Sequence, residues 1–155
     1  MEGDPAFQSA TVTAEVEVDT ETGRVNVLSC VLSQDVGRCI NPITLEGQMQ
    51  GATIQGIGYA LTEDAVYSDG LHLNPNFVDY KILTALDVPE IVPLVVEEPD
   101  PTGPYGAKGV GEGSLVPQAP AIANAIYDAI GVRIKELPIT AEKIRRALKE
   151  KGSNR

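Results

Sequence analysis

Residue types that often build catalytic or metal centres are scarce in this sequence. Its 155 residues include two cysteines, one histidine and no tryptophan. Cys30 and Cys39 form neither a disulfide framework nor a Cys-x-x-Cys metal pair, so we expect both to be packing residues. His72 lies in a turn-rich stretch without a second imidazole or thiolate, so we expect a loop histidine and no zinc site. A nucleophilic serine elbow, a zinc-protease motif and a phosphate-binding P-loop are also missing, which excludes those enzyme classes.

Positive charge and long apolar runs are scarce as well. The 12 lysines and arginines are outnumbered by 22 aspartates and glutamates, and the net charge is -10. This balance argues against nucleic acid and membrane surfaces as partners. Apolar stretches such as residues 91–96 fall far below the roughly 20 residues of a membrane-spanning helix, and the N-terminus has no signal-peptide pattern. We therefore expect a cytoplasmic protein.

The length and the 43% content of hydrophobic residues suit one globular unit, and periodicity predicts its strands. Residues 11–18 alternate between apolar and polar, whereas residues 25–32 are apolar on both faces. This pattern predicts a β-hairpin whose second strand lies inside a sheet. A proline interrupts the run at residues 91–96, which favours a strand near an edge. Residues 132–137 are predicted to form a short strand.

Helices are predicted near residues 44–61, 117–130 and 141–150. Thr44 and Thr140 are expected to cap the first and the last helix, Glu46 should lie near the positive end of the first, and Gly131 should end the second. An inward stripe of the second helix should include Ala129. The fold is therefore expected to be α+β: a mixed sheet built on an N-terminal β-hairpin, with about three helices packed against it.

The first predicted helix contains four glycines, each costing about 1 kcal/mol relative to alanine in a helix interior. We expect something to approach its backbone closely at these positions, which are Gly47, Gly51, Gly56 and Gly58. Gln48 projects from the same helix, either as a site amide or as an ordinary exposed side chain.

A second glycine-dense segment, residues 106–113, is predicted to be a loop with a helix starting behind it, an arrangement that can bind an anion. It is no dinucleotide-binding loop, because Ser114 stands where the last glycine of that fingerprint belongs. Glu112 has glycine on both sides, which presents its carboxylate without neighbouring bulk and suits a general base. The alternative is an ordinary solvent-exposed loop glutamate.

Three motifs in order resemble the molybdopterin-binding subunit of the xanthine dehydrogenase and aldehyde oxidase family. The first is Asp-Val-Gly-Arg-Cys-Ile-Asn-Pro at residues 35–42, and the second is Gly-Gln-Met-Gln-Gly-Ala-Thr-Ile-Gln-Gly-Ile-Gly at residues 47–58. The third is Gly-Ala-Lys-Gly-Val-Gly-Glu at residues 106–112. The similarity runs from the region of Phe7 to Pro138 and so covers nearly the whole chain.

The resemblance implies roles for particular residues. Glu112 corresponds to the family's general base, which deprotonates a molybdenum-bound hydroxide while an N-heterocycle or aldehyde is hydroxylated with water as the oxygen source. The expected contacts of the cofactor are Gln48, Ala107, Lys108, Gly109, Val110 and Gly111. No protein side chain is expected to ligate the metal, because the pterin dithiolene holds it.

The family's molybdenum subunit is several times longer than this chain, which starts in its middle. Residues 1–155 are accordingly expected to form a single C-terminal lobe of the cofactor-binding domain. The resemblance implies molybdopterin as the cofactor, in its plain or cytosine dinucleotide form, with 2Fe-2S and FAD groups expected on partner subunits or domains.

The expected partners are the N-terminal part of the molybdenum subunit, the iron-sulfur and FAD subunits and a small-molecule substrate. By itself the chain should be inactive, because it supplies one wall of the site. It is either a natural split subunit or a fragment, and a non-catalytic assembly or cofactor-holding module is the alternative function.

Overall fold

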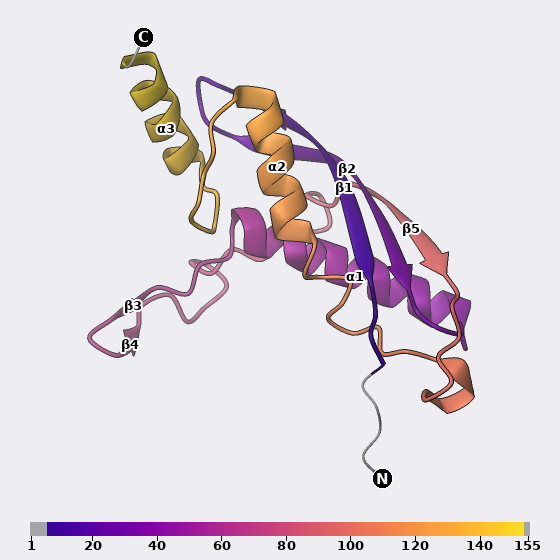
Figure 1. Cartoon of the computed structure of the whole chain (residues 1–155). Helices are drawn as coiled ribbons and strands as arrows, with labels where there is room; N and C mark the ends of the chain where they lie inside the picture. The colour runs from indigo at the N-terminus through magenta and orange to yellow at the C-terminus, as the bar shows by residue number, and fades with distance from the viewer. Residues whose placement is uncertain (1–5, 154–155) are drawn as a thin grey trace.

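The computed structural model describes residues 6–153 and has the expected α+β architecture (Figure 1). Its main sheet has the order β1-β2-β5, in which β1 and β2 pair antiparallel and β2 and β5 pair parallel. The strands are β1 (Ala10–Val18), β2 (Val25–Asp35) and β5 (Glu90–Val96). The hairpin, the interior position of its second strand and the edge position of the proline-containing strand are confirmed.

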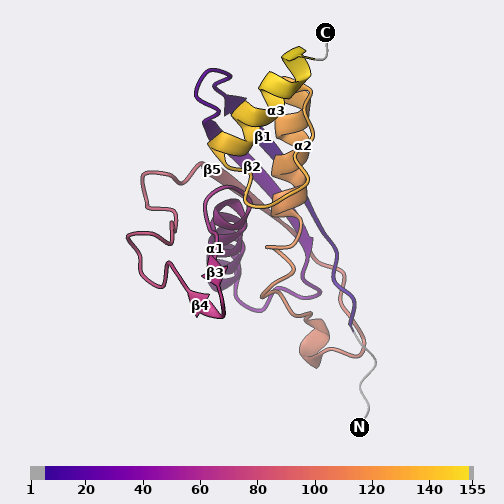
Figure 2. The same cartoon turned by 90° about the vertical axis from the view of Figure 1, so that its left-hand side faces the viewer.

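The three predicted helices are present as α1 (Pro42–Leu61), α2 (Gln118–Ile130) and α3 (Ala141–Ser153). α2 packs on β1, and α1 packs on α2, β2 and β5. In Figure 2 α3 lies beside the turn of the β1–β2 hairpin, where Ala141 closely approaches Gly23. All three helices therefore lie against the sheet or its hairpin end, as expected.

The capping predictions were partly wrong. α1 begins at Pro42, and its cap is Asn41, whose side chain accepts a hydrogen bond from the N–H of Thr44 at 3.2 Å. Thr44 thus lies inside the first turn, and Glu46 lies beyond that turn, which holds no acidic residue. Asparagine followed by proline is a stronger start signal than a threonine two residues later.

The ends of α2 and α3 match the sequence more closely. Gly131 ends α2 with a left-handed φ of 64°, and the hydroxyl of Thr140 accepts a hydrogen bond from the N–H of Lys143 at 3.3 Å. The expected inward stripe of α2 is only partly correct, since Ile122 and Ile126 are buried whereas Ala129 is exposed.

Residues 132–137 form no strand, contrary to the prediction. The segment connects α2 to α3, and just after it the N–H of Ile139 donates to the carbonyl of Ala60 at the end of α1, at 2.7 Å. Within the segment Ile134 packs partly buried against the main core cluster, so its apolar character serves the connection to the core and not the pairing with a sheet edge.

Two apolar clusters form the core. The larger one lies between the sheet and the helices and includes Ile57, Ile122 and Ile144. The smaller one joins the end of β2 to the start of α1 through Leu32, Val36, Leu45 and Met49. Cys30 is buried in the first cluster and Cys39 packs partly buried against the second, so both cysteines are packing residues as expected.

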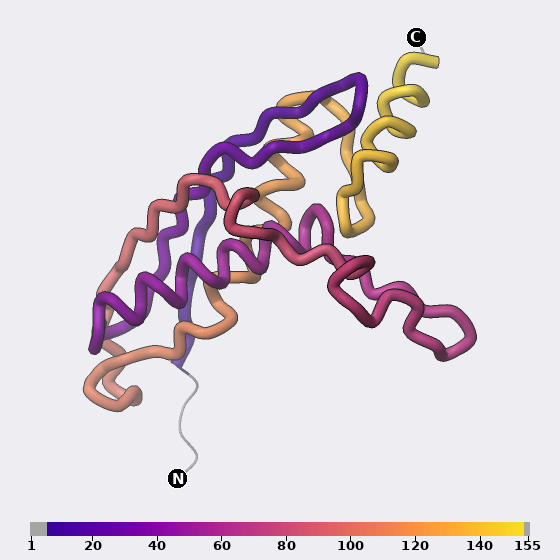
Figure 3. Tube along the Cα trace, turned by 180° about the vertical axis from the view of Figure 1, so that it is seen from behind, coloured from indigo at the N-terminus to yellow at the C-terminus, as the bar shows by residue number. Residues whose placement is uncertain are grey.

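Residues 62–89, called the arm below, connect α1 to β5, and the part of the arm around β3 and β4 projects from the rest of the molecule (Figures 1 and 3). The arm carries the two-residue strands β3 (Tyr67–Ser68) and β4 (Leu71–His72), joined by Asp69 and Gly70 with positive φ values of 48° and 80°. His72 therefore lies in a short strand and not in a loop, and its ring stacks on Tyr67 at 4.8 Å. Of the arm's residues only Asn74 is buried.

Along residues 6–153, no helix is both long and apolar enough to cross a membrane.

Candidate functional site

The first and third sequence motifs lie side by side although about 70 residues separate them. The N–H of Lys108 donates to the carbonyl of Val36, and the N–H of Arg38 donates to the carbonyl of Gly106, both at 2.9 Å. Between them Gly37 pairs with Ala107 and has a φ of +66°. A side chain at Gly37 would collide with the backbone of Lys108, so the close pairing requires glycine.

An ion pair fixes the same junction. Lys108 Nζ lies 2.6 Å from Asp35 Oδ2, and the two side chains are 9% and 19% exposed. The hydrogen bond from Lys108 lowers the pKa of Asp35, and the N–H of Gly37, which donates to Asp35 Oδ1 at 2.9 Å, lowers it further. The Lys108 ammonium is thus held by the protein itself through Asp35.

All three motifs meet around one pocket of about 320 Å³. The pocket brings together four of the predicted site residues, namely Gln48, Ala107, Lys108 and Val110. Asn41 and Thr44 complete one wall, so the helix start that faces the glycine loop belongs to α1. α2, the helix predicted behind the loop, begins at Gln118 and does not line this pocket.

The glycine loop leaves its backbone available beside this pocket. Among the hydrogen bonds of residues 6–153, none is donated by the backbone N–H groups of residues 109–113. A Cβ at Gly109 or Gly111 would meet open space, so neither position is filled by the rest of the described chain. A bulky ligand with several hydrogen-bond acceptors fits such a surface, because it can approach the bare backbone and receive these donors.

Glu112 stands in a tight turn at the end of this loop. Its carbonyl accepts hydrogen bonds from the N–H groups of Leu115 at 3.0 Å and Val116 at 3.3 Å. The side chain is exposed, and it takes part in no ion pair within the described part of the chain. Glu112, Gly109 and Gly111 are not part of the pocket lining, so the predicted site residues are only partly brought together.

A group of buried polar side chains beneath the turn was missed by sequence reasoning. Ser114 Oγ donates to Gln34 Oε1, and Gln118 Nε2 donates to Thr53 Oγ1 at 3.0 Å and to the Ser114 carbonyl at 3.1 Å. All four side chains are at most 1% exposed. The available signal was a glutamine at an inward position of β2, but the predicted strand ended before it. These residues are called the buried polar cluster below: Gln34, Thr53, Ser114 and Gln118.

The glycines of α1 differ in what surrounds them. A Cβ at Gly56 would lie 2.5 Å from the Gln118 side chain, and one at Gly58 would collide with Glu63. Gly47 and Gly51 face open space. Close approach is therefore confirmed for two of the four positions within the described residues.

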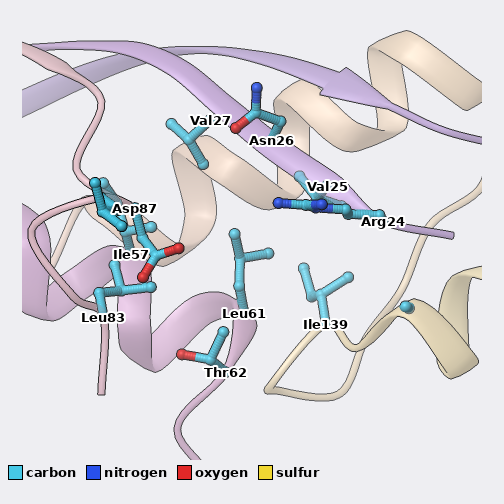
Figure 4. Close-up of a pocket in the computed structure, with 12 residues that line it drawn as sticks. Arg24, Val25, Asn26, Val27, Ile57, Leu61, Thr62, Leu83, Asp87 and Ile139 are labelled. Carbon is cyan, nitrogen blue, oxygen red and sulfur yellow. The ribbon is translucent and has the colours of Figure 1, made fainter. Parts of the chain in front are cut away.

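A second hollow of about 290 Å³ lies near the hairpin, at the C-terminal end of α1 (Figure 4). Its walls are mainly aliphatic, with Val27, Leu61 and Ile139 among them, and Arg24 and Asp87 add charge. None of its lining residues comes from the first or the third motif. Groups of three or more histidine, cysteine, aspartate or glutamate side chains able to hold a metal ion are not found within residues 6–153.

A family model and the individual relatives of this chain point to the same family. Residues 1–89 match the family model of the molybdopterin cofactor-binding domain. The chain is 42% identical over 134 residues to the 6-hydroxypseudooxynicotine dehydrogenase complex subunit gamma of Paenarthrobacter nicotinovorans, covering 84% of the chain and 17% of that protein. It is 37% identical over 142 residues to a putative xanthine dehydrogenase molybdenum-binding subunit of Escherichia coli, covering 90% of the chain and 19% of that protein.

Solved structures that match this chain in fold and sequence are also oxidoreductases. Quinoline 2-oxidoreductase from Pseudomonas putida matches with a TM-score of 0.82 and 38% identity, over 87% of the chain and 18% of that structure. Aldehyde oxidoreductase from Desulfovibrio gigas matches with a TM-score of 0.81 and 40% identity, over 88% of the chain and 15% of that structure. The chain therefore spans less than a fifth of each of these four relatives.

Proposed function

We propose that this chain, which belongs to the molybdopterin cofactor-binding domain family of xanthine dehydrogenase and aldehyde oxidoreductase subunits, forms one wall of a molybdenum hydroxylase active site. The observation that carries the proposal is the meeting of three distant motifs around one pocket beside a glycine loop with free N–H groups. The rest of the active site would come from the remaining part of a molybdenum subunit.

The backbone of residues 107–111 is the part of the chain that fits the pterin. Ala107, Lys108 and Val110 line the pocket, and the free N–H groups of Gly109 and Gly111 can donate to the polar edge of a pterin or to a phosphate. Gln48, across the pocket, would add a side-chain amide. When bound, the molybdenum cofactor, in its plain or cytosine dinucleotide form, supplies the two-electron redox centre for hydroxylation.

Glu112 is proposed to be the general base. Its exposed carboxylate is unpaired in the described chain, and the glycines on both sides allow a reacting group to come within the roughly 3 Å that proton transfer requires. It would accept the proton of the water-derived nucleophile and hold it during attack on the substrate. The arrangement separates two roles, because the loop backbone binds the cofactor while the side chain handles the proton.

Substrate and partners follow from the relatives' names alone. The relatives are described as acting on quinoline, aldehydes or xanthine, so an N-heterocycle or an aldehyde is the proposed substrate class. One relative is a subunit of a dehydrogenase complex. Electrons would accordingly leave through 2Fe-2S and FAD groups on partner subunits, and the chain alone would be inactive, since it holds one wall of the site.

A non-catalytic cofactor-holding module is the second candidate. The observation in its favour is that the Glu112 carboxylate is not part of the lining of the pocket that the three motifs share. In that case the loop would bind the cofactor and another polypeptide would provide the base.

Substitution of Glu112 in an assembled enzyme tests the proposal. The chain is combined with the rest of a molybdenum subunit and its partners, loaded with cofactor and compared with Glu112→Gln. We expect kcat to fall at least about 100-fold, as for loss of a general base, with molybdenum and pterin contents unchanged. Glu17→Gln, which alters an exposed glutamate of β1, is the matched control and should have normal kcat.

The outcomes separate the two candidates. If Glu112→Gln kept normal turnover and full cofactor content, the general-base role would be wrong and the cofactor-holding module would be supported. Failure of the assembled wild-type protein to retain molybdopterin would overturn both.

A further inference from the structure

The buried polar cluster lies directly beneath the turn that presents Glu112. We propose that Ser114 and Gln34 are positioning residues that hold this turn in the geometry that a general base needs. This inference rests on the proposed function, because it concerns the placement of Glu112. It adds two residues that lie outside the three sequence motifs and outside the pocket lining.

The first argument is the place of Ser114 in the turn. It lies two residues after Glu112, inside the turn that the bond from the Leu115 N–H to the Glu112 carbonyl closes at 3.0 Å. Ser114 is fully buried, and its hydroxyl donates to Gln34, which is 1% exposed in the interior strand β2. Since water does not reach this pair, the bond has no competitor and its loss leaves a buried acceptor unsatisfied.

A second connection runs from the same residue to the helices. The Ser114 carbonyl accepts a hydrogen bond from Gln118 Nε2, which also donates to Thr53 Oγ1 at 3.0 Å. The Thr53 hydroxyl in turn donates to the Met49 carbonyl of α1 at 2.9 Å. The turn is therefore linked to β2 by the Ser114 side chain and to α1 by the Ser114 backbone.

The fit between the turn and the cluster is close. A Cβ at Gly113 would collide with the Gln8 side chain and would lie 2.9 Å from Gln34 Nε2, which donates to Gln8 Oε1, so the backbone of the turn packs against this pair of amides. On the other side of Glu112, the N–H groups of residues 109–113 donate to no acceptor in the described chain. The position of Glu112 is thus determined mainly from the Ser114 side, together with the more distant anchor at Lys108.

This matters for catalysis because a base must be placed within about 0.5 Å of its productive position. Loss of the Ser114–Gln34 bond would leave the carboxylate chemically unchanged but free to move. Turnover should then fall although cofactor and substrate still bind. A side chain with a purely structural role would change the stability and leave the turnover of the folded enzyme unaltered.

Ser114→Ala in the assembled enzyme is the primary test, with Ser29→Ala as its control. Ser29 also donates to a side chain, Glu15, but the bond is exposed and distant from the loop. For Ser114→Ala we expect kcat to fall at least tenfold, with KM within twofold of the wild-type value and normal molybdenum content. Amide hydrogen exchange at Leu115 and Val116, measured on the cofactor-free assembly, should be at least tenfold faster, because these amides report the closure of the Glu112 turn.

A double variant separates positioning from stability. Gln34→Met combined with Ser114→Ala removes both partners of this bond. Gln8, which accepts from Gln34 Nε2 at 2.9 Å, is exposed and can bond to water instead, so the double variant leaves no new buried acceptor unsatisfied and thermal stability should largely recover. We expect the low kcat and the fast exchange at Leu115 to persist, because the link is still missing. Recovery of kcat together with Tm would overturn the positioning role.

The result also distinguishes this inference from the proposed function. A loss of activity in Glu112→Gln with normal kcat in Ser114→Ala would overturn only the positioning role. Normal activity in Glu112→Gln would overturn the general base itself, whatever Ser114→Ala did.

Discussion

Two irregular segments of this molecule have opposite relations to the core. Residues 106–117, the anchored segment, are tied to β2 and α1 by the Lys108–Asp35 ion pair and by the bonds of Ser114. In the arm, residues 62–89, large apolar side chains face solvent, with Phe77 83% exposed and Leu86 97% exposed. The first segment is anchored by polar groups, whereas most of the large apolar side chains of the arm are exposed and only Leu83 packs against the main core cluster.

The contrast shows how irregular backbone is fixed. The anchored segment has few buried apolar groups, and side chains of β2 accept hydrogen bonds from its Lys108 and Ser114 side chains. The hydrogen bonds of the arm are local, such as those that Asn74 makes with Val66 and Asp64. Local bonds preserve the shape of a segment, but only bonds to distant elements fix its position relative to the core, which a catalytic loop requires.

Alanine substitutions at two glycines of α1 test whether the anchored segment is firmly supported, and they should give the largest change in the free energy of unfolding. Gly56→Ala should lower the free energy of unfolding by about 1–3 kcal/mol, because the new Cβ would displace Gln118 from its bonds to Thr53 and Ser114. Gly51→Ala should raise it by about 0.5–1 kcal/mol, because that position is open and alanine favours a helix. Urea unfolding of both variants measures the difference.

Equal effects at the two positions would contradict this view. If Gly56→Ala were neutral, Gln118 could move without cost, and the buried polar cluster would not be a rigid support for the turn.

Loss of the Lys108–Asp35 ion pair, at the other end of the anchored segment, should change the free energy of unfolding by a smaller amount that depends on pH. Lys108→Met should cost about 1 kcal/mol at neutral pH, since the pair is only partly exposed. Because Lys108 lowers the pKa of Asp35 in the folded state, the contribution is complete above the unfolded pKa of about 3.9. It should disappear as the pH falls through the lower, folded pKa.

Unfolding curves between pH 2 and 7, with an NMR titration of the Asp35 carboxyl group, measure this dependence. Lys143→Met is the control, because its partner Glu136 is 75% exposed at 3.6 Å and should contribute little. A stability difference between wild type and Lys108→Met that stayed constant down to pH 2 would show that the stabilisation does not come from the charge of Asp35.

Much of the regular structure could be predicted from local sequence. The alternation of residues 11–18 and the doubly apolar run that follows predicted the hairpin and the interior position of β2. Gly131 and Thr140 marked helix ends because their backbone and capping preferences act locally. Residues 132–137 were wrongly assigned to a strand because apolar composition alone does not distinguish a strand from a buried connection.

The site was only partly predictable, because its contacts join residues far apart in the sequence. Lys108 bonds to Asp35 and Ser114 bonds to Gln34, and each contact depends on the parallel pairing of β2 with β5, which periodicity does not specify. Glycine density identified the loop and helix position singled out Gln48, motif resemblance gave both a cofactor role, and their places around one pocket required the fold. The buried polar cluster was missed because the predicted second strand ended at residue 32, before Gln34, whereas β2 continues to Asp35.

A substitution in the arm should give the smallest change in the free energy of unfolding, and it tests whether the exposed apolar side chains of the arm contribute to stability. Leu86→Ser should change the free energy of unfolding by less than about 0.5 kcal/mol, because this side chain is already almost fully exposed. Leu83, three residues earlier, packs against the main core cluster, and Leu83→Ser should cost about 1 kcal/mol or more. Urea unfolding of both variants measures the difference. A loss at Leu86 as large as that at Leu83 would mean that the arm packs on the core at Leu86 as well as at Leu83, and the two segments would then differ in the chemistry of their anchors but not in how firmly they are anchored.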